Sequence, residues 1–198
     1  IIEFVEHLKP ADGLVKDLQG QREGFQFWTW DWYTHQGVRD HLDRMINQGL
    51  SWHFYFNPND VWKPWAREKY PESLYIPDSY DSYVDTTVLD PFPGSAWAQR
   101  LVDDARRIFA SYPRCDGLFL DQVYYDLNNH RKDDGVSIRL DAKPFSRHQW
   151  NLYRTLKEIR KLADQHGRTL HANFILNSLE IASLTDFGLL EGVDPLQN

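Results

Sequence analysis

Two acidic side chains follow short apolar runs, a position in which a strand can deliver a carboxylate to a sheet edge. Asp121 follows the run 115–120, and Glu191 follows the run 187–190. Two opposed carboxylates can cleave a glycosidic bond. One attacks the anomeric carbon or guides a water molecule, and the other protonates the leaving oxygen. We therefore predict that Asp121 is the nucleophile and Glu191 the acid/base of a retaining reaction.

These acids need a sheet to position them, and the sequence contains the elements for one. Five apolar runs have the shape of buried strands: 25–30, 51–56, 115–120, 169–174 and 187–190. Segments 38–46, 97–109 and 150–163 have helical periodicity, with Ser95 and Ser146 as expected N-caps and Gly49 and Gly167 as expected ends. Strands that alternate with amphipathic helices predict a parallel sheet of the α/β class.

The number of strands bears on the kind of parallel sheet. A (β/α)8 TIM barrel has eight strands and about 250 residues, whereas this chain has 198 residues and five predicted strands. We predict one catalytic domain over residues 1–198, an incomplete barrel with about strands 2 to 6, and expect the remainder in a larger chain. An open doubly wound sheet is the alternative, although no glycine-rich phosphate motif follows any strand.

Side-chain alternation predicts which residues face the inside of such a barrel. Asp121 shares a face with Gly117 and Phe119, whereas Leu118 and Leu120 face the helices. The same rule groups His53 with Tyr55 and Asn57, His171 with Asn173, and Leu189 with Glu191. Asn57 also suits a turn, because Asn and Pro favour turns. The predicted substrate contacts, all at or near strand ends, are Trp30, Asp31, His53, Tyr55, Asn57, Tyr124 and Asn173.

Aromatic content and charge narrow the class of partner. The chain holds eight tryptophans and ten tyrosines, and sugar rings stack on such side chains, so we expect a carbohydrate substrate. Segment 59–93 is long and aromatic, and we expect it to form a lid or a wall of the cleft. The net charge of -7 disfavours nucleic acid, and no apolar run approaches the roughly 18 residues that span a membrane. We therefore expect neither nucleic acid nor membrane as a partner.

Two short motifs resemble a known group of enzymes. Residues 116–121, Asp-Gly-Leu-Phe-Leu-Asp, resemble the fourth-strand motif of retaining barrel glycoside hydrolases in the dextranase-like, alpha-galactosidase-like and polygalactosaminidase-like families. Residues 185–192 resemble the sixth strand of such enzymes, with a terminal glutamate. The resemblance implies a retaining barrel glycosidase with Asp121 as nucleophile and Glu191 as acid/base. The alpha-galactosidase-like pattern differs, because its sixth strand ends on aspartate and a lysine lies near its nucleophile.

Two other classes of function remain open from the sequence. A metal-dependent hydrolase could use His53, Asp121, His171 and Glu191 as ligands for a metal that activates water. The sequence has no His-x-His or His-Glu-x-x-His array, so we expect no metal and no cofactor. The other class is a catalytically inactive, carbohydrate-binding barrel, in which the cleft binds sugar without turnover.

Overall fold

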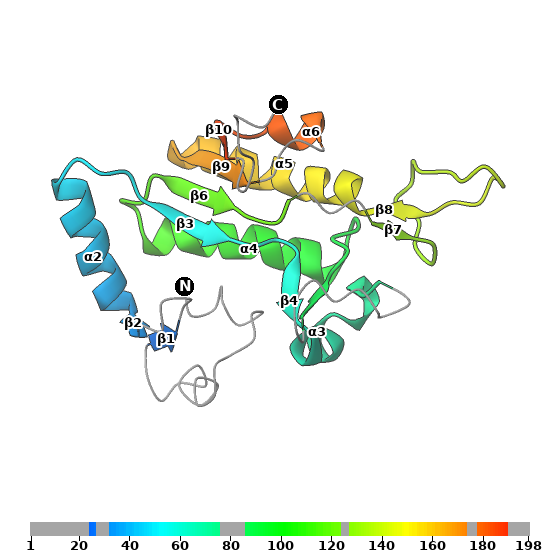
Figure 1. The fold of residues 1–198 in the computed structure, drawn as a ribbon, viewed down its shortest axis with the longest axis horizontal. Coiled ribbons are helices and arrows are strands. Elements are labelled where there is room, and N and C mark those ends of the chain that lie inside the picture. Colours follow the sequence, from blue (N-terminus) through cyan, green and yellow to red (C-terminus); the bar gives the residue numbers. More distant parts are fainter. Residues whose placement is uncertain (1–23, 27–31, 76–85, 124–126, 174–177, 190–198) are drawn as a thin grey trace, which may run out of the picture.

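The centre of the fold is a four-stranded parallel sheet (Figure 1). The computed structural model describes residues 24–26, 32–75, 86–123, 127–173 and 178–189. The sheet contains β3 (His53–Phe56), β6 (Gly117–Leu120), β9 (Thr169–Asn173) and β10 (Phe187–Leu189), which are neighbours in chain order. The prediction of a parallel α/β sheet is confirmed for these strands.

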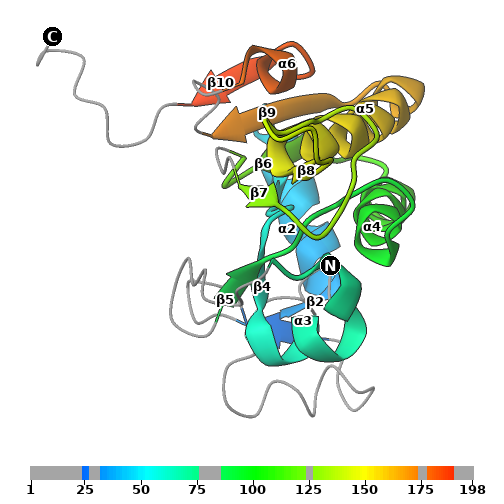
Figure 2. The same ribbon diagram turned by 90° about the vertical axis from the view of Figure 1, so that its right-hand side faces the viewer.

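Helices connect the strands of this sheet. Helix α2 (His35–Asn47) precedes β3, α4 (Ala96–Ser111) leads to β6, α5 (His148–His166) leads to β9, and α6 (Leu179–Ala182) leads to β10. Helices α4 and α5 lie side by side on the same face of the sheet (Figure 2). A doubly wound sheet reverses its strand order at a switch point, whereas a barrel keeps chain order. The four strands described keep chain order, and they do not by themselves close a barrel.

The hydrophobic core lies between the sheet and helices α4 and α5. One face of β3, β6 and β9 is buried against these helices, and it consists of Phe54, Phe56, Leu118, Leu120, Leu170 and Ala172. The helices contribute Leu101, Ile108, Leu152, Leu156 and Ile159. The predicted alternation is confirmed, because the intervening side chains of β3, β6 and β9 lie on the opposite, more polar face.

The predicted helix boundaries hold with one exception. Ser95 caps α4, since its hydroxyl oxygen accepts a hydrogen bond from the Ala98 amide at 3.1 Å. Gly167 ends α5 in the left-handed conformation. Ser146 is not an N-cap, because Arg147 precedes α5 and makes no side-chain cap. The Ser146 hydroxyl is buried and instead donates to the Asp90 carboxylate at 2.8 Å.

Of the first predicted strand, 25–30, the structure describes Phe25 and Gln26, and these two residues lie outside the parallel sheet. Strand β1 (Gly24–Gln26) pairs antiparallel with β2 (Trp32–Thr34), and residues 27–31 lie outside the described part of the chain. An apolar pattern predicts a strand but does not select its partner. Two strands close in sequence pair with a small loss of loop-closure entropy, which favours the local hairpin.

Segment 59–93 contains regular structure in place of the predicted long loop. It holds β4 (Asp60–Trp62), α3 (Lys63–Lys69), the 3-10 helix η3 (Pro71–Ser73) and β5 (Thr86–Val88), which pairs antiparallel with β4. Its Trp65 and Tyr70 pack against Trp97 of α4, with ring centroids 6.4 and 5.3 Å away. These elements are too short to produce a clear hydrophobic period, and residues 76–85 are not described.

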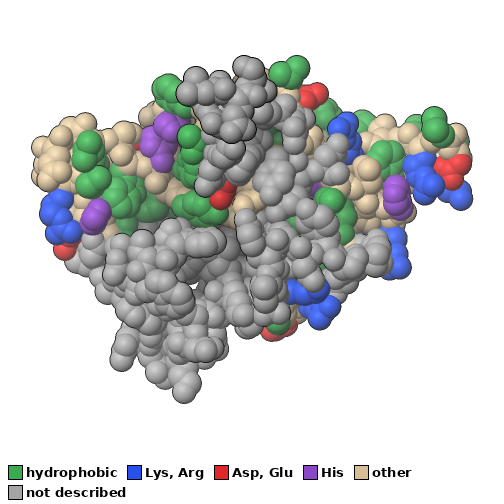
Figure 3. Space-filling model, viewed as in Figure 1, with side chains coloured by type: hydrophobic (Ala, Val, Ile, Leu, Met, Phe, Trp, Pro, Cys, Tyr) green, Lys and Arg blue, Asp and Glu red, His purple; other side chains and the backbone are tan. Residues whose placement is uncertain are grey.

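An arm formed by residues 128–147 follows β6 and projects from the body of the protein (Figure 1). Strands β7 (Asn128–Asn129) and β8 (Ser146–Arg147) pair antiparallel at its base. The buried Asp134 accepts hydrogen bonds there from the amides of Val136 and Arg147 at 2.9 Å. Hydrophobic and basic side chains mix on the exposed arm (Figure 3).

None of the helices within the described ranges is both long and apolar enough to cross a bilayer.

Candidate active site

The Asp121 carboxylate lies directly after β6 and is held by side chains from both neighbouring strands. Its Oδ2 accepts a hydrogen bond from the Tyr55 hydroxyl at 2.7 Å, and its Oδ1 accepts one from the Asn173 amide at 3.0 Å. Tyr55 belongs to β3, and Asn173 is the last residue of β9. The parallel strands therefore bring three predicted site residues together at their carboxyl ends.

The backbone fixes Asp121 further. Its amide donates to the carbonyl of Phe56 at 3.0 Å, which extends the pairing of β6 with β3 by one residue. The amide of Gln122 donates to Oδ1 of Asp121 at 2.9 Å. Each carboxylate oxygen thus accepts at least one hydrogen bond, which restricts rotation of the side chain while a lone pair stays available for attack.

The structure describes two further predicted substrate residues, Asn57 and His53. Asn57 is buried, and its Oδ1 accepts a hydrogen bond from the Asn59 amide at 3.0 Å, which is a turn contact. His53 lies two positions before Tyr55 on β3, toward the amino end of the strand. Four predicted residues fall outside the described part of the chain: Trp30, Asp31, Tyr124 and the acid Glu191. Their roles, and the separation of the two carboxyl groups, stay predictions.

His53, the first residue of β3, stacks on His171 in the middle of β9. Their ring centroids are 3.9 Å apart, and Nε2 of His53 lies 2.6 Å from the Thr169 hydroxyl. Among the described residues, no group of three or more histidine, cysteine, aspartate or glutamate side chains could hold a metal ion. The two histidines of the metal-site alternative therefore contact each other, away from the hydrogen bonds that hold Asp121.

The histidine pair predicts a dependence of stability on pH. Burial lowers the pKa of both imidazoles, and the charge of His171 lowers the pKa of His53 further, whereas Asp116 and Asp186 oppose these effects. The unfolded chain, in which a histidine pKa is about 6.5, then binds more protons than the folded chain. We therefore expect the contribution to stability to be complete above about pH 6.5 and to be lost as the pH falls below it.

This effect can be measured by chemical denaturation between pH 5 and pH 8. From pH 8 to pH 5 we expect the free energy of unfolding to fall by less than about 1 kcal/mol, because solvent still reaches both rings. His171→Gln should reduce the decrease, since it removes one titrating ring and its repulsion on His53. An unchanged pH dependence in this variant would contradict the assignment.

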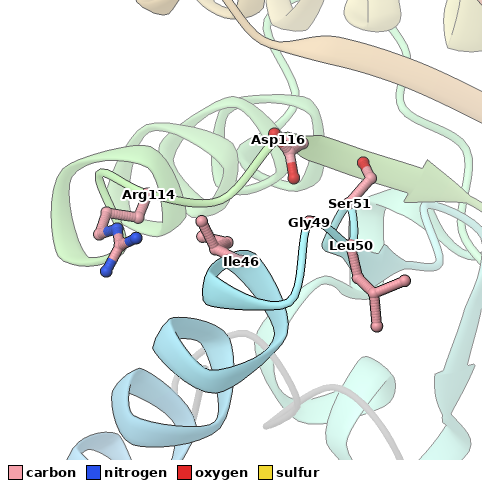
Figure 4. Close-up of a pocket in the computed structure, with 6 residues that line it drawn as sticks. All are labelled: Ile46, Gly49, Leu50, Ser51, Arg114 and Asp116. Carbon is pink, nitrogen blue, oxygen red and sulfur yellow. The ribbon is translucent and has the colours of Figure 1, made fainter.

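A surface hollow of about 390 Å³ lies at the opposite edge of the sheet (Figure 4). Its lining consists of Ile46, Gly49, Leu50, Ser51, Arg114 and Asp116. Arg114 forms an ion pair with Asp43, and Oδ2 of Asp116 accepts a hydrogen bond from the Trp52 amide at 2.7 Å. These contacts join the segments before β3 and β6 to each other and to α2, at the end of the strands opposite Asp121. This hollow is therefore not the candidate active site.

Two residues near Asp121, Gln122 and Asn59, were not among the residues predicted from the sequence. The side-chain amide of Asn59 donates to the Gln122 carbonyl, which joins the segment after β3 to the segment after β6. The Asn-Pro-Asn run signals a turn at residues 57–59, but nothing in the sequence indicates that this turn contacts the segment after β6.

Comparison with known proteins gives matches at the level of structure. No protein-family model matches the sequence, and the search of curated proteins gives no match. The glycoside hydrolase domain of PelA from Pseudomonas aeruginosa is similar, with a TM-score of 0.56 and 14% identity over 78% of this chain and 56% of that one. Ega3 from Aspergillus fumigatus, in complex with galactosamine, has a TM-score of 0.51 and 14% identity over 77% and 55%.

A third similar structure is a cycloisomaltooligosaccharide glucanotransferase from Paenibacillus, with a TM-score of 0.53 and 9% identity over 78% of this chain and 23% of that one. The chain thus spans about half the length of the PelA and Ega3 structures. Similarity at such low identity shows the fold. The resemblance predicted from the two motifs is confirmed at this level: the chain shares its fold with glycoside hydrolase domains.

Proposed function

We propose that this chain is the catalytic part of a glycoside hydrolase built on a (β/α)8 barrel, to which the sheet contributes four neighbouring strands. The supporting observation is the Asp121 carboxylate after β6, which Tyr55 and Asn173 hold from the two flanking strands. Loops at the carboxyl ends of barrel strands carry the chemistry in enzymes of this fold. The shared fold with glycoside hydrolase domains supports the same reading.

The proposed reaction retains the configuration of the anomeric carbon. Asp121 attacks this carbon and forms a glycosyl-enzyme, while Glu191 donates its proton to the departing glycosidic oxygen. Glu191 then takes a proton from water, whose oxygen attacks the anomeric carbon and releases Asp121 as a carboxylate. Trp30, Asp31 and Tyr124 are proposed substrate contacts on the basis of their positions in the sequence.

The substrate is proposed to be an oligosaccharide or polysaccharide. Among the similar structures, Ega3 is in complex with galactosamine and the Paenibacillus enzyme with cycloisomaltoheptaose. The net charge of -7 suits a polymer that carries protonated amines, because opposite charges accelerate association. Galactosamine-containing polymers are therefore the first substrates to test, followed by dextran.

The test is release of reducing ends from these polymers by the purified protein. We expect hydrolysis, and proton NMR should show that the first product has the anomeric configuration of the substrate. An inverted first product would contradict the nucleophilic role of Asp121. Binding of a polymer without any release would favour the inactive carbohydrate-binding barrel, and stoichiometric zinc or manganese in the active protein would favour the metal-dependent hydrolase.

Tyr55→Phe should lower kcat about 10- to 100-fold, since a hydrogen bond to a charged group contributes about 1.5–3 kcal/mol. The phenyl ring keeps the shape of the side chain but removes the donor that lies 2.7 Å from Oδ2 of Asp121. Steady-state kinetics would measure the change. Tyr153→Phe is a matched control, because Tyr153 is a half-buried phenol on α5 that packs against the core. Equal kcat values for the two variants would remove Tyr55 from the mechanism.

A further inference from the structure

Gln122, the residue that follows Asp121, has an unusual backbone conformation. Its φ of 59° lies in the left-handed region, which is unfavourable for residues with a Cβ atom. In the peptide unit that joins it to Asp121, the Gln122 amide donates to Oδ1 at 2.9 Å, and the left-handed φ lets the chain continue from Gln122 with this peptide unit in that orientation. A strained residue beside a functional group points to a role for the strain, provided that the surrounding structure holds it in place.

Asn59 supplies that support. Its side-chain amide donates to the Gln122 carbonyl, and its side chain is fully buried. Asn59 is itself held at both backbone polar groups, since its amide donates to Oδ1 of Asn57 at 3.0 Å and its carbonyl accepts from the Leu89 amide at 3.3 Å. The residue that contacts Gln122 is therefore anchored to the end of β3 and to β5.

We propose that Asn59 and Gln122 are positioning residues for the nucleophile. Asn59 holds Gln122 in the left-handed conformation, and the Gln122 amide then fixes the rotation of the Asp121 carboxylate. Without this amide, the described side chains donate one hydrogen bond to each carboxylate oxygen of Asp121. Tyr55 donates to Oδ2, and Asn173 donates to Oδ1. The inference rests on the proposed function, because it treats Asp121 as the attacking group.

Three substitutions of Gln122 separate its backbone conformation from its side-chain contacts. Gln122→Gly, Gln122→Ala and Gln122→Val all remove the side-chain amide, but the left-handed conformation is easy for glycine, harder for alanine and hardest for β-branched valine. We expect kcat to fall in that order, with valine about tenfold or more below glycine, which corresponds to ~1.4 kcal/mol. KM should change much less, because substrate contacts are retained. Equal kcat values would overturn the proposal.

Removal of the support provides a second test. Asn59→Ala should lower kcat, and addition of Gln122→Gly should restore part of the loss, because glycine adopts the conformation without the Asn59 contact. Asn151→Ala is the matched control: Asn151 is fully buried and donates to Asp90 at 2.8 Å, so its loss should reduce stability without lowering kcat at a temperature where the variant is folded. If Gln122→Gly does not raise the kcat of Asn59→Ala, or raises the kcat of Asn59→Ala and of Asn151→Ala by the same factor, the proposal is wrong.

A readout that needs no substrate separates this proposal from the proposed function. In ¹⁵N-labelled protein, the amide proton shift of residue 122 should follow the titration of the Asp121 carboxylate in the parent and in Gln122→Gly, but not in Gln122→Val. A shift that ignores this titration in the parent would overturn the positioning role, whether or not the protein is active. A parent without hydrolytic activity, with the titration as expected, would instead remove the proposed function.

Discussion

Asp121→Asn should lower kcat on the order of 10³-fold or more, as the loss of a nucleophile does in other enzymes. Asparagine has nearly the same shape as aspartate, so the fold and substrate binding should persist. An amide is a poor nucleophile, however. Its NH₂ group would also face hydrogen-bond donors in either orientation: Tyr55 at the position of Oδ2, or Asn173 and the Gln122 amide at the position of Oδ1. Steady-state kinetics on the polymer that the parent cleaves would measure the loss.

Asp116→Asn is the matched control for this substitution. Asp116 lies just before the same strand, five residues earlier in the 116–121 motif, and accepts a hydrogen bond from the Trp52 amide at 2.7 Å. The chemical change is identical, but it occurs at the amino end of β6. We expect a modest loss of stability and nearly unchanged kcat. Comparable activity of the two variants, either both active or both inactive, would contradict a nucleophilic role for Asp121.

Gly117→Ala should destabilise the fold by several kcal/mol or prevent folding. A Cβ atom at this position would lie 1.8 Å from the Thr169 carbonyl oxygen and 3.0 Å from Cδ2 of His53. The first contact is with backbone, so β6 and β9 would have to move apart at Gly117, where the two strands are paired. Urea denaturation of the purified variant would measure the free energy of unfolding, and absence of folded protein would also agree with the prediction.

Gly49→Ala distinguishes steric overlap from the general effect of adding a methyl group at a glycine. A Cβ atom on Gly49 would meet nothing within 4 Å, although the φ of 77° disfavours alanine. We expect a loss of about 1 kcal/mol from the backbone conformation alone. If Gly117→Ala is no more destabilising than Gly49→Ala, the close approach of β6 and β9 at Gly117 is not present in solution.

The side of the sheet on which each side chain of β3, β6 and β9 lies could be predicted from the sequence, because the alternation of side chains along a strand is a local property. Phe54 and Phe56 are buried on the helix side, while Tyr55 between them reaches Asp121. Parallel pairing of strands in chain order then places Asn173 beside the same carboxylate. The meeting of Tyr55, Asp121 and Asn173 thus follows from local pattern and a simple topology.

Other features depend on partners that a local pattern cannot specify. Residues 24–26 form a strand, but their partner is β2, six to ten residues along the chain in the paired register, rather than a strand of the parallel sheet. Ser146 has the residue type of an N-cap, but its hydroxyl donates a hydrogen bond to the carboxylate of Asp90, which is 56 residues away in the sequence. The contact of Asn59 with Gln122 spans 63 residues and joins two turns of irregular structure.

The hydrogen bonds of the Asp121 carboxylate have a consequence for folding. Its side-chain partners lie 66 residues before it and 52 residues after it, on different strands. A slip of one residue in either pairing would turn Tyr55 or Asn173 toward the helices and bring apolar neighbours such as Phe54 or Ala172 to the carboxylate. Misaligned sheets would therefore bury polar groups without partners and lose the hydrogen bonds of Asp121 together. The same groups that orient the proposed nucleophile thus discriminate against incorrect strand alignment, so selection for catalysis would also preserve accurate folding.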